Sequence, residues 1–321
     1  MRNRALTIAP LLFAGCEGVQ SALAPAGRDA ERIANLFWAM VVGGGVVWLI
    51  VMAVAVYGAR AKHEHSEKLA GRFILWGGVV FPTVTITALL IGGLALLPPT
   101  LDLGPDEPRL AVVGEQFWWR ARYRQGDQWV EVANELHLPT GRRTAMTLES
   151  PDVIHAFWVP SLGGKVDTIP GRTNHIAYEP TRAGTYRGAC TEYCGQAHAL
   201  MAFHVVAEEP AAFETWLAHQ AEPATEPTDA EATRGAALFL EHGCGACHAV
   251  RGTEAAGVIG PDLTHVGSRA HLGGVLPNDT ASLVRFIREP EAIKPDVRMP
   301  AFTTLSDAET AAIAHYLEGL R

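Results

Sequence analysis

The sequence predicts a multi-domain membrane protein with three parts: a two-helix transmembrane hairpin, an all-β domain and an all-α domain. Two long apolar runs without charge, residues 33–57 and 73–97, predict the hairpin. Short segments rich in β-forming residues within 108–220 predict the β domain. A C-x-x-C-H motif, residues 244–248, is followed by helical patterns that predict the α domain up to residue 321.

Composition narrows the function classes. The 321 residues carry a formal net charge of -8, which argues against nucleic acid but leaves room for a cationic protein partner. Length suggests about two domains, and the hydrophobic fraction of 48% is high for a soluble chain. The cysteine count is five, and each cysteine has a separate predicted role, so no disulfide is expected.

Residues 1–15 predict a signal segment. Arg2 and Arg4 precede an apolar run that is too short to span a bilayer. Leu12-Phe13-Ala14-Gly15-Cys16 resembles a bacterial lipobox, which implies that Cys16 is lipidated and becomes the mature N-terminus. Phe13 departs from the small or aliphatic residue usual there, so cleavage nearby or an uncleaved segment remain alternatives.

The region 30–98 predicts two membrane-spanning helices, because each apolar run reaches the roughly 20 residues needed to cross the hydrocarbon core. The loop between the runs carries Arg60, Lys62, Lys68 and Arg72, whereas the chain beyond the second run is acidic. The positive-inside rule therefore places the loop in the cytoplasm and both ends outside. We expect the bacterial cytoplasmic (inner) membrane, with the later domains on its periplasmic or outer face.

The β domain, residues 108–220, contains a cluster of metal-binding side chains. Cysteine and methionine are soft ligands and imidazole suits copper. Within twelve residues the chain offers Cys190, Cys194, His198 and Met201, and His155 follows an upstream strand-like run. Two bridging thiolates with two imidazoles suit a pair of copper ions that shares one electron; a disulfide or a single zinc is the alternative.

This pattern resembles the binuclear copper A motif of cytochrome c oxidase subunit II, over roughly residues 30–220. The resemblance implies a cupredoxin-like fold with the copper loops at one end. It also implies copper ligands at His155, Cys190, the carbonyl of Glu192, Cys194, His198 and Met201.

Two further sites are implied by the resemblance alone. The Glu192 side chain would bind magnesium at the contact with subunit I, although a solvated carboxylate is the alternative. Phe117, Trp118 and Trp119 would form an electron-transfer patch. Phe117 stands where the family usually has Trp, a departure that weakens direct electron entry from a free donor.

The all-α domain, residues 229–321, follows a polar, Pro-bearing linker, residues 221–228, that we expect to be flexible. Thr228 and Glu231 predict a capping box for a helix that runs to about His242. The C-x-x-C-H spacing lets Cys244 and Cys247 form thioethers with a haem while His248 ligates the iron; a redox dithiol or a zinc knuckle is the alternative.

The surrounding segments resemble class I cytochromes c. Gly260-Pro261-Asp262-Leu263 resembles the loop whose proline carbonyl orients the ligating histidine, here Pro261 and His248. Arg298-Met299-Pro300 would supply Met299 as the second axial ligand. Ser306 and Glu309 predict the cap of a last helix that crosses the first.

Together these resemblances imply subunit II of a caa-type, proton-translocating haem-copper oxidase with a fused cytochrome c domain. Electrons would pass from haem c to copper A and then to haem a in subunit I, where dioxygen is reduced to water. The chain would therefore be an electron-transfer subunit without catalytic residues of its own. Expected partners are subunits I and III, the lipid bilayer, and a cytochrome c or quinol-oxidising complex as donor, with no nucleic acid.

Two other classes of function stay open from the sequence alone. One is a copper-A-bearing component of a nitric oxide or nitrous oxide reductase, which the catalytic partner subunit would distinguish. The other is a copper chaperone for oxidase assembly, which would bind one copper and need neither Met201 nor a haem.

Overall fold

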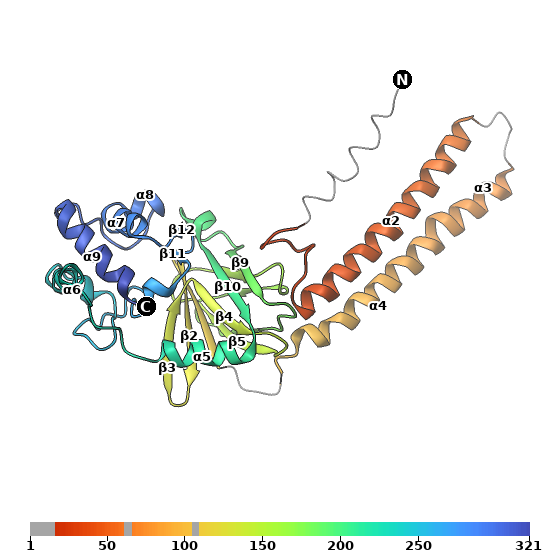
Figure 1. The fold of residues 1–321 in the computed structure, drawn as a ribbon. Helices are drawn as coiled ribbons and strands as arrows, with labels where there is room; N and C mark the ends of the chain where they lie inside the picture. The colour runs from red at the N-terminus through yellow and green to blue at the C-terminus, as the bar shows by residue number, and fades with distance from the viewer. Residues whose placement is uncertain (1–16, 61–65, 105–108) are drawn as a thin grey trace, which may run out of the picture.

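The computed structural model describes residues 17–60, 66–104 and 109–321. In Figure 1 a β sandwich lies between a long helical hairpin and a small helical domain at the C-terminal end. Cys16 and the rest of the predicted signal segment lie outside the described residues.

The hairpin consists of α2 (Arg28–Arg60) and a second helix in three pieces. These are α3 (Glu67–Phe73), a π-helical stretch, η1 (Ile74–Val80), and α4 (Phe81–Leu101). Pro82 lacks the N–H that an α-helix needs, which the wider π-helical turn before it accommodates. Both helices are long and apolar enough to cross a membrane, and none of their most apolar stretches is buried in the protein. Both are longer than the predicted runs.

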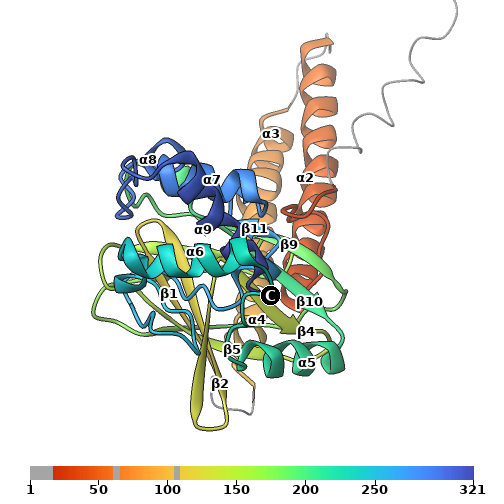
Figure 2. The ribbon, with the colours of Figure 1, turned by 60° about the vertical axis from the view of Figure 1, so that its left-hand side comes forward.

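Figures 1 and 2 show α2 and α4 side by side, leading away from the sandwich. The segment before α2 fixes the hairpin to the sandwich. The Ala26 amide donates to Ser161 O at 2.7 Å, and the Thr181 amide donates to Ala26 O at 2.7 Å. A Cβ at Gly27 would lie 2.3 Å from the carbonyl oxygen of Leu162, so this close approach requires glycine.

Two five-stranded sheets form the sandwich. One has the order β3-β2-β1-β5-β8: β1 (Leu110–Glu115), β2 (Trp118–Gln125), β3 (Gln128–Ala133), β5 (Thr144–Glu149) and β8 (Asn174–Tyr178). The other has the order β4-β10-β9-β6-β7: β4 (Glu135–Pro139), β6 (His155–Trp158), β7 (Lys165–Thr168), β9 (Gly184–Cys190) and β10 (Ala202–Glu208). The predicted closing helix is α5 (Pro210–Gln220).

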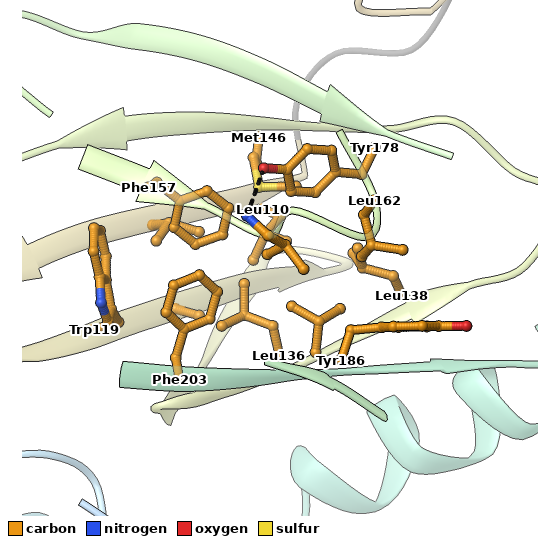
Figure 3. Packing of buried hydrophobic residues seen from close by; sticks show 14 of the residues in the cluster. Leu110, Trp119, Leu136, Leu138, Met146, Phe157, Leu162, Tyr178, Tyr186 and Phe203 are labelled. Carbon is orange, nitrogen blue, oxygen red and sulfur yellow. Dashed lines mark hydrogen bonds between the residues drawn. The ribbon is translucent and has the colours of Figure 1, made fainter. Parts of the chain in front are cut away.

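The core lies between these sheets and is rich in aromatic side chains (Figure 3). Trp119 meets Phe157 edge-on with ring centroids 5.3 Å apart, and Phe157 stacks on Phe203 at 4.6 Å. All three are buried. Phe157 lies two residues after His155 on β6, and Phe203 on β10 lies two residues after Met201, so the aromatic core anchors strands that carry or adjoin predicted ligands.

The C-terminal domain packs α6 (Ala230–Glu241) across α9 (Asp307–Gly319), with α7 (Thr280–Arg288) and α8 (Pro290–Ile293) beside them. Short elements η3 (Cys244–Ala246), η4 (Val266–Ser268), β11 (His271–Leu272) and β12 (Leu276–Pro277) connect the helices. At the crossing, a Cβ on Gly235 would lie 2.0 Å from Ala312 O, so the helices approach closely at a glycine.

The structure corrects two expectations for this region. The cap of α6 is Asp229, whose carboxylate accepts the Ala232 amide at 2.7 Å, and not Thr228. The linker is not free: the Ala224 amide donates to Arg251 O at 2.9 Å, and the Glu222 carbonyl oxygen lies 3.1 Å from His265 Nε2. The capping box of Ser306 and Glu309 on α9 is confirmed.

Candidate metal centre and haem site

The predicted copper ligands come together at one end of the sandwich. His155 opens β6, Cys190 closes β9, and Met201 immediately precedes β10. The two sulfurs of Cys190 and Cys194 are 3.8 Å apart, and Cys190 Sγ is 3.9 Å from His155 Nδ1. The ligand atoms of His155, Cys190 and Cys194 all lie within 4.8 Å of one another.

The second half of the cluster lies around Cys194. Its sulfur is 3.5 Å from His198 Nδ1 and 3.8 Å from Met201 Sδ. The carbonyl oxygen of Glu192 lies 3.2 Å from the sulfur of Cys190. Every predicted copper ligand therefore has its donor atom beside one of the two sulfurs, and each sulfur has one imidazole next to it.

The electrostatics of the two thiols favour a cation between them. Contact with Cys194 lowers the pKa of the Cys190 thiol, and the resulting thiolate raises the pKa of Cys194. Like charges at this distance resist ionising together. A cation that binds both sulfurs removes this repulsion, and the presence of Met201 beside them suits copper better than zinc. The residues present therefore fit a copper pair.

Asp152 holds His155 in place, a role that the sequence interpretation missed. Its carboxylate lies 2.9 Å from His155 Nε2 and accepts the Gln116 amide at 2.8 Å. Burial opposes ionisation of Asp152, but the hydrogen bonds from His155, Gln116 and Val153 lower its pKa to about 2. An ionised carboxylate at Nε2 leaves His155 Nδ1 as the atom that faces Cys190.

The loop that carries Cys194 and His198 turns at Gly195, directly after Cys194, where φ is +131°. A Cβ here would lie 2.9 Å from the ring of Phe117, so both the backbone conformation and the close approach require glycine. Glu192 is exposed on this loop, and among the described residues it belongs to no group of three or more His, Cys, Asp or Glu side chains that could hold a metal ion.

The predicted aromatic patch divides between core and surface. Trp119 is fully buried in the sandwich, with Nε1 3.5 Å from Met201 O. Phe117 is also buried, against the copper loop. Trp118 is half-buried beneath the Arg120 guanidinium, which lies 4.5 Å from its ring centroid. Of the three, only Trp118 lies near the surface of the chain.

The haem motif forms a preorganised histidine site. The short helical turn η3 contains Cys244, and Cys247 caps it, with both thiols free. His248 Nδ1 lies 2.8 Å from Pro261 O, as the sequence interpretation expects. Burial lowers the pKa of His248, which keeps the imidazole neutral and its Nε2 available to iron.

The packing around this histidine also suits a haem. A Cβ at Gly260 would lie 2.5 Å from the His248 ring, so the loop can approach the imidazole only through glycine. Met299 is half-buried and packs on the hydrophobic core of this domain. A neutral imidazole, two free thiols and a thioether fit a haem with thioether links.

The C-terminal domain docks directly on the copper-site end of the sandwich. The Lys294 ammonium donates to Phe117 O at 2.8 Å, and the Arg120 guanidinium donates to Val258 O at 3.2 Å. The rings of His204 and His271 stack across the contact at 3.8 Å. Sequence reasoning did not identify these contacts, because they join residues far apart in the chain.

Fold and sites together define a membrane-anchored electron-transfer protein that combines a cupredoxin-like copper domain with a cytochrome c domain. Residues 120–208 match the family described as cytochrome c oxidase subunit II, periplasmic domain, and residues 232–321 match cytochrome c. Cytochrome c oxidase subunit 2 of Alkalihalophilus pseudofirmus is 32% identical over 333 residues, covering 98% of this chain and 96% of that protein. The Bacillus subtilis protein of the same name is 29% identical over 346 residues, with the same two coverages.

The chain therefore belongs to the cytochrome c oxidase subunit 2 family. Among solved structures, the periplasmic domain of subunit II of the Bradyrhizobium japonicum oxidase is 26% identical and covers 37% of this chain and 96% of that one, with a TM-score of 0.35. The predicted fold class is confirmed, and the family implies copper A, a haem and a subunit I partner. The reductase and chaperone alternatives are not favoured.

Proposed function

We propose that the C-terminal domain is the entry point for electrons, and that the copper domain receives them and passes them to subunit I, where dioxygen is reduced. The observation that carries this proposal is the docking of the C-terminal domain over Phe117, directly beside the copper loop. When bound, haem c and copper A would each supply a one-electron carrier.

The proposed haem c and copper A are each held by a separate set of residues. Cys244 and Cys247 would bind the haem covalently, with His248 and Met299 on its iron and Pro261 orienting His248. The proposed copper ligands are His155, Cys190, Glu192 O, Cys194, His198 and Met201. The exposed Glu192 carboxylate is the proposed magnesium ligand at the face toward subunit I.

The proposed orientation places both metal domains on the periplasmic side of the bacterial cytoplasmic membrane. It is supported by the basic residues at the turn of the hairpin, Arg60 and Arg72 among them, and by the sandwich at its opposite end (Figure 1). Subunit III, an anchoring lipid on Cys16, and a cytochrome c or quinol-oxidising complex as donor belong to the same proposal.

Rapid mixing of the assembled, fully oxidised oxidase with a reduced soluble cytochrome c tests the proposed order. The haem c absorption should change first, and the near-infrared absorption of the copper pair should follow at a rate independent of donor concentration. Reduction of the copper before the haem, at a rate proportional to donor concentration, would show that electrons enter at the copper domain.

A further inference from the structure

Lys294 places a buried amino group at the contact between the two metal domains. It follows α8 directly, and only 2% of its surface is exposed. Its side chain passes Gly273 of its own domain and ends at the sandwich, where Nζ donates to the carbonyl oxygen of Phe117 at 2.8 Å. The two residues are 177 positions apart in the chain.

The stability of the C-terminal domain does not explain a lysine here. Among the described residues, Lys294 forms no ion pair, and burial lowers its pKa to about 7. A buried ammonium group without a carboxylate partner costs free energy that an apolar side chain of the same length would not. What the amine adds is a hydrogen-bond donor aimed across the domain contact.

The segment that accepts this hydrogen bond touches the copper loop at two points. The Phe117 ring lies against Gly195, and the Gln116 side-chain amide donates to Cys194 O at 2.6 Å. Lys294 therefore holds a backbone unit that is itself fixed to the copper loop at the proposed ligand Cys194 and at its neighbour Gly195.

The same connecting segment of the C-terminal domain reaches the copper site again. Arg298 lies 3.8 Å from Asp152, the carboxylate that orients His155. Its neighbour Met299 is the proposed axial ligand of the haem iron. Residues 294–299 thus contact the surroundings of the copper site at both ends while carrying the proposed haem ligand.

We propose that Lys294 is a positioning residue for electron transfer: its hydrogen bond to Phe117 O fixes the cytochrome c domain in one orientation on the copper domain. The electron-transfer part rests on the proposed function, whereas the docking part rests on these contacts alone.

Hydrogen exchange in the assembled oxidase tests the docking part. The Ala270 amide donates across the contact to Glu135 Oε2 at 2.9 Å, whereas the Leu263 amide donates within its own domain to Ala249 O at 2.8 Å. In Lys294→Met, Ala270 should exchange about tenfold faster, the loss expected for one buried hydrogen bond, and Leu263 should not change. Lys294→Leu is measured as a second variant. If both variants show faster exchange at Ala270, poor packing of the Met side chain alone does not explain the result.

Internal electron transfer supplies the second measurement. After photoreduction of the haem, the rate of copper reduction should fall about tenfold in both variants, with haem and copper spectra unchanged. Arg285→Met, which removes an exposed cation from α7 of the same domain, should affect neither measurement.

The outcomes separate this inference from the proposed function. Unchanged Ala270 exchange and unchanged transfer in both Lys294 variants would overturn the positioning role. Faster exchange at Leu263 as well as Ala270 would also overturn it, because the lysine would then stabilise its own domain. A wild type with both centres loaded but no fast internal transfer would refute the proposed electron route, while the exchange result still decides the docking role.

Discussion

Asp152 lies 2.9 Å from Nε2 of His155, which leaves Nδ1 of that histidine facing the sulfur of Cys190. The carboxylate is fixed in turn by the Gln116 amide. The orientation of one proposed copper ligand thus depends on a residue three positions earlier in the chain.

Replacing Asp152 with Asn should weaken copper binding about 10- to 100-fold, as loss of such a supporting hydrogen bond typically does. The Asn side chain has the same size but cannot offer a charged acceptor to the Nε2–H group of His155. Copper retention under a graded series of chelator concentrations measures the change. Asp127→Asn at the exposed β2–β3 turn is the control and should retain copper like the wild type. Equal retention by both variants would show that Asp152 does not support the site.

Substitutions of Cys194 and of Met201 should affect the proposed copper pair differently. Cys194 lies between Cys190, His198 and Met201, so Cys194→Ser would remove one of the two thiolates proposed to hold both copper ions and should abolish the shared-electron copper signal. Met201→Leu removes only a terminal thioether and should keep both copper ions with an altered potential. Electron paramagnetic resonance with copper analysis distinguishes these results. A wild-type spectrum of one isolated copper ion would contradict the binuclear assignment.

The stacked pair of His204 and His271 should make domain docking sensitive to acid. Burial, and then the charge of His271, lower the pKa of His204 from 6.5 to about 4; Arg187 adds to this and Glu135 opposes it. Because the pKa of His204 is lower in the docked state, its contribution to docking is fully present at pH values above the pKa of the undocked histidine. That stabilisation is lost as pH falls from about 6.5 towards 4, because the undocked histidine takes up a proton first.

Hydrogen exchange at Ala270 relative to Leu263, measured between pH 7.5 and 4.5, follows this loss. The ratio should rise as the pH falls in the wild type. In His204→Phe, which can still stack on His271 but cannot take up a proton, the ratio should depend less on pH. The same pH dependence in both proteins would assign the effect to other groups.

Whether a structural feature can be predicted from the sequence depends on how far apart its residues lie along the chain. Five of the six proposed copper ligands lie within twelve residues, and Pro261 is near His248 in the chain, so local patterns identify them. The ends of helices are predicted less exactly from the sequence. Thr228 and Asp229 can both cap a helix, and only the fold selects Asp229.

Contacts between the domains could not be predicted from local patterns. The bonds of Lys294 to Phe117 and of Arg120 to Val258 depend on how two finished domains pack. For the same reason the linker was expected to be flexible, although Arg251 and other groups of the C-terminal domain hold it in place. Asp152 was visible in the sequence, but a carboxylate gains its supporting role only when a histidine ring turns towards it.

Removal of the C-terminal domain should separate copper binding from electron entry. All proposed copper ligands lie before residue 202, so a chain that ends after Gln220 should keep its copper spectrum and its membrane hairpin. It would lose the docked domain and uncover the Phe117 carbonyl and the Arg120 guanidinium, which that domain contacts. Because Phe117 stands where the family usually has Trp, a soluble donor should use this surface poorly. Oxygen uptake by the truncated complex should then be slow and should rise steeply with donor concentration.

The matched comparison is Met299→Ala in the full-length chain, which keeps the domain docked and changes only the proposed axial ligand. It should retain the covalent haem, shift its potential and slow turnover without introducing the steep dependence on donor concentration. Steady-state oxygen uptake over a range of donor concentrations, measured for both variants and the wild type, distinguishes the two effects. If the truncated complex matches the wild type at every concentration, the C-terminal domain is not the required entry point, and the proposed order of transfer is wrong.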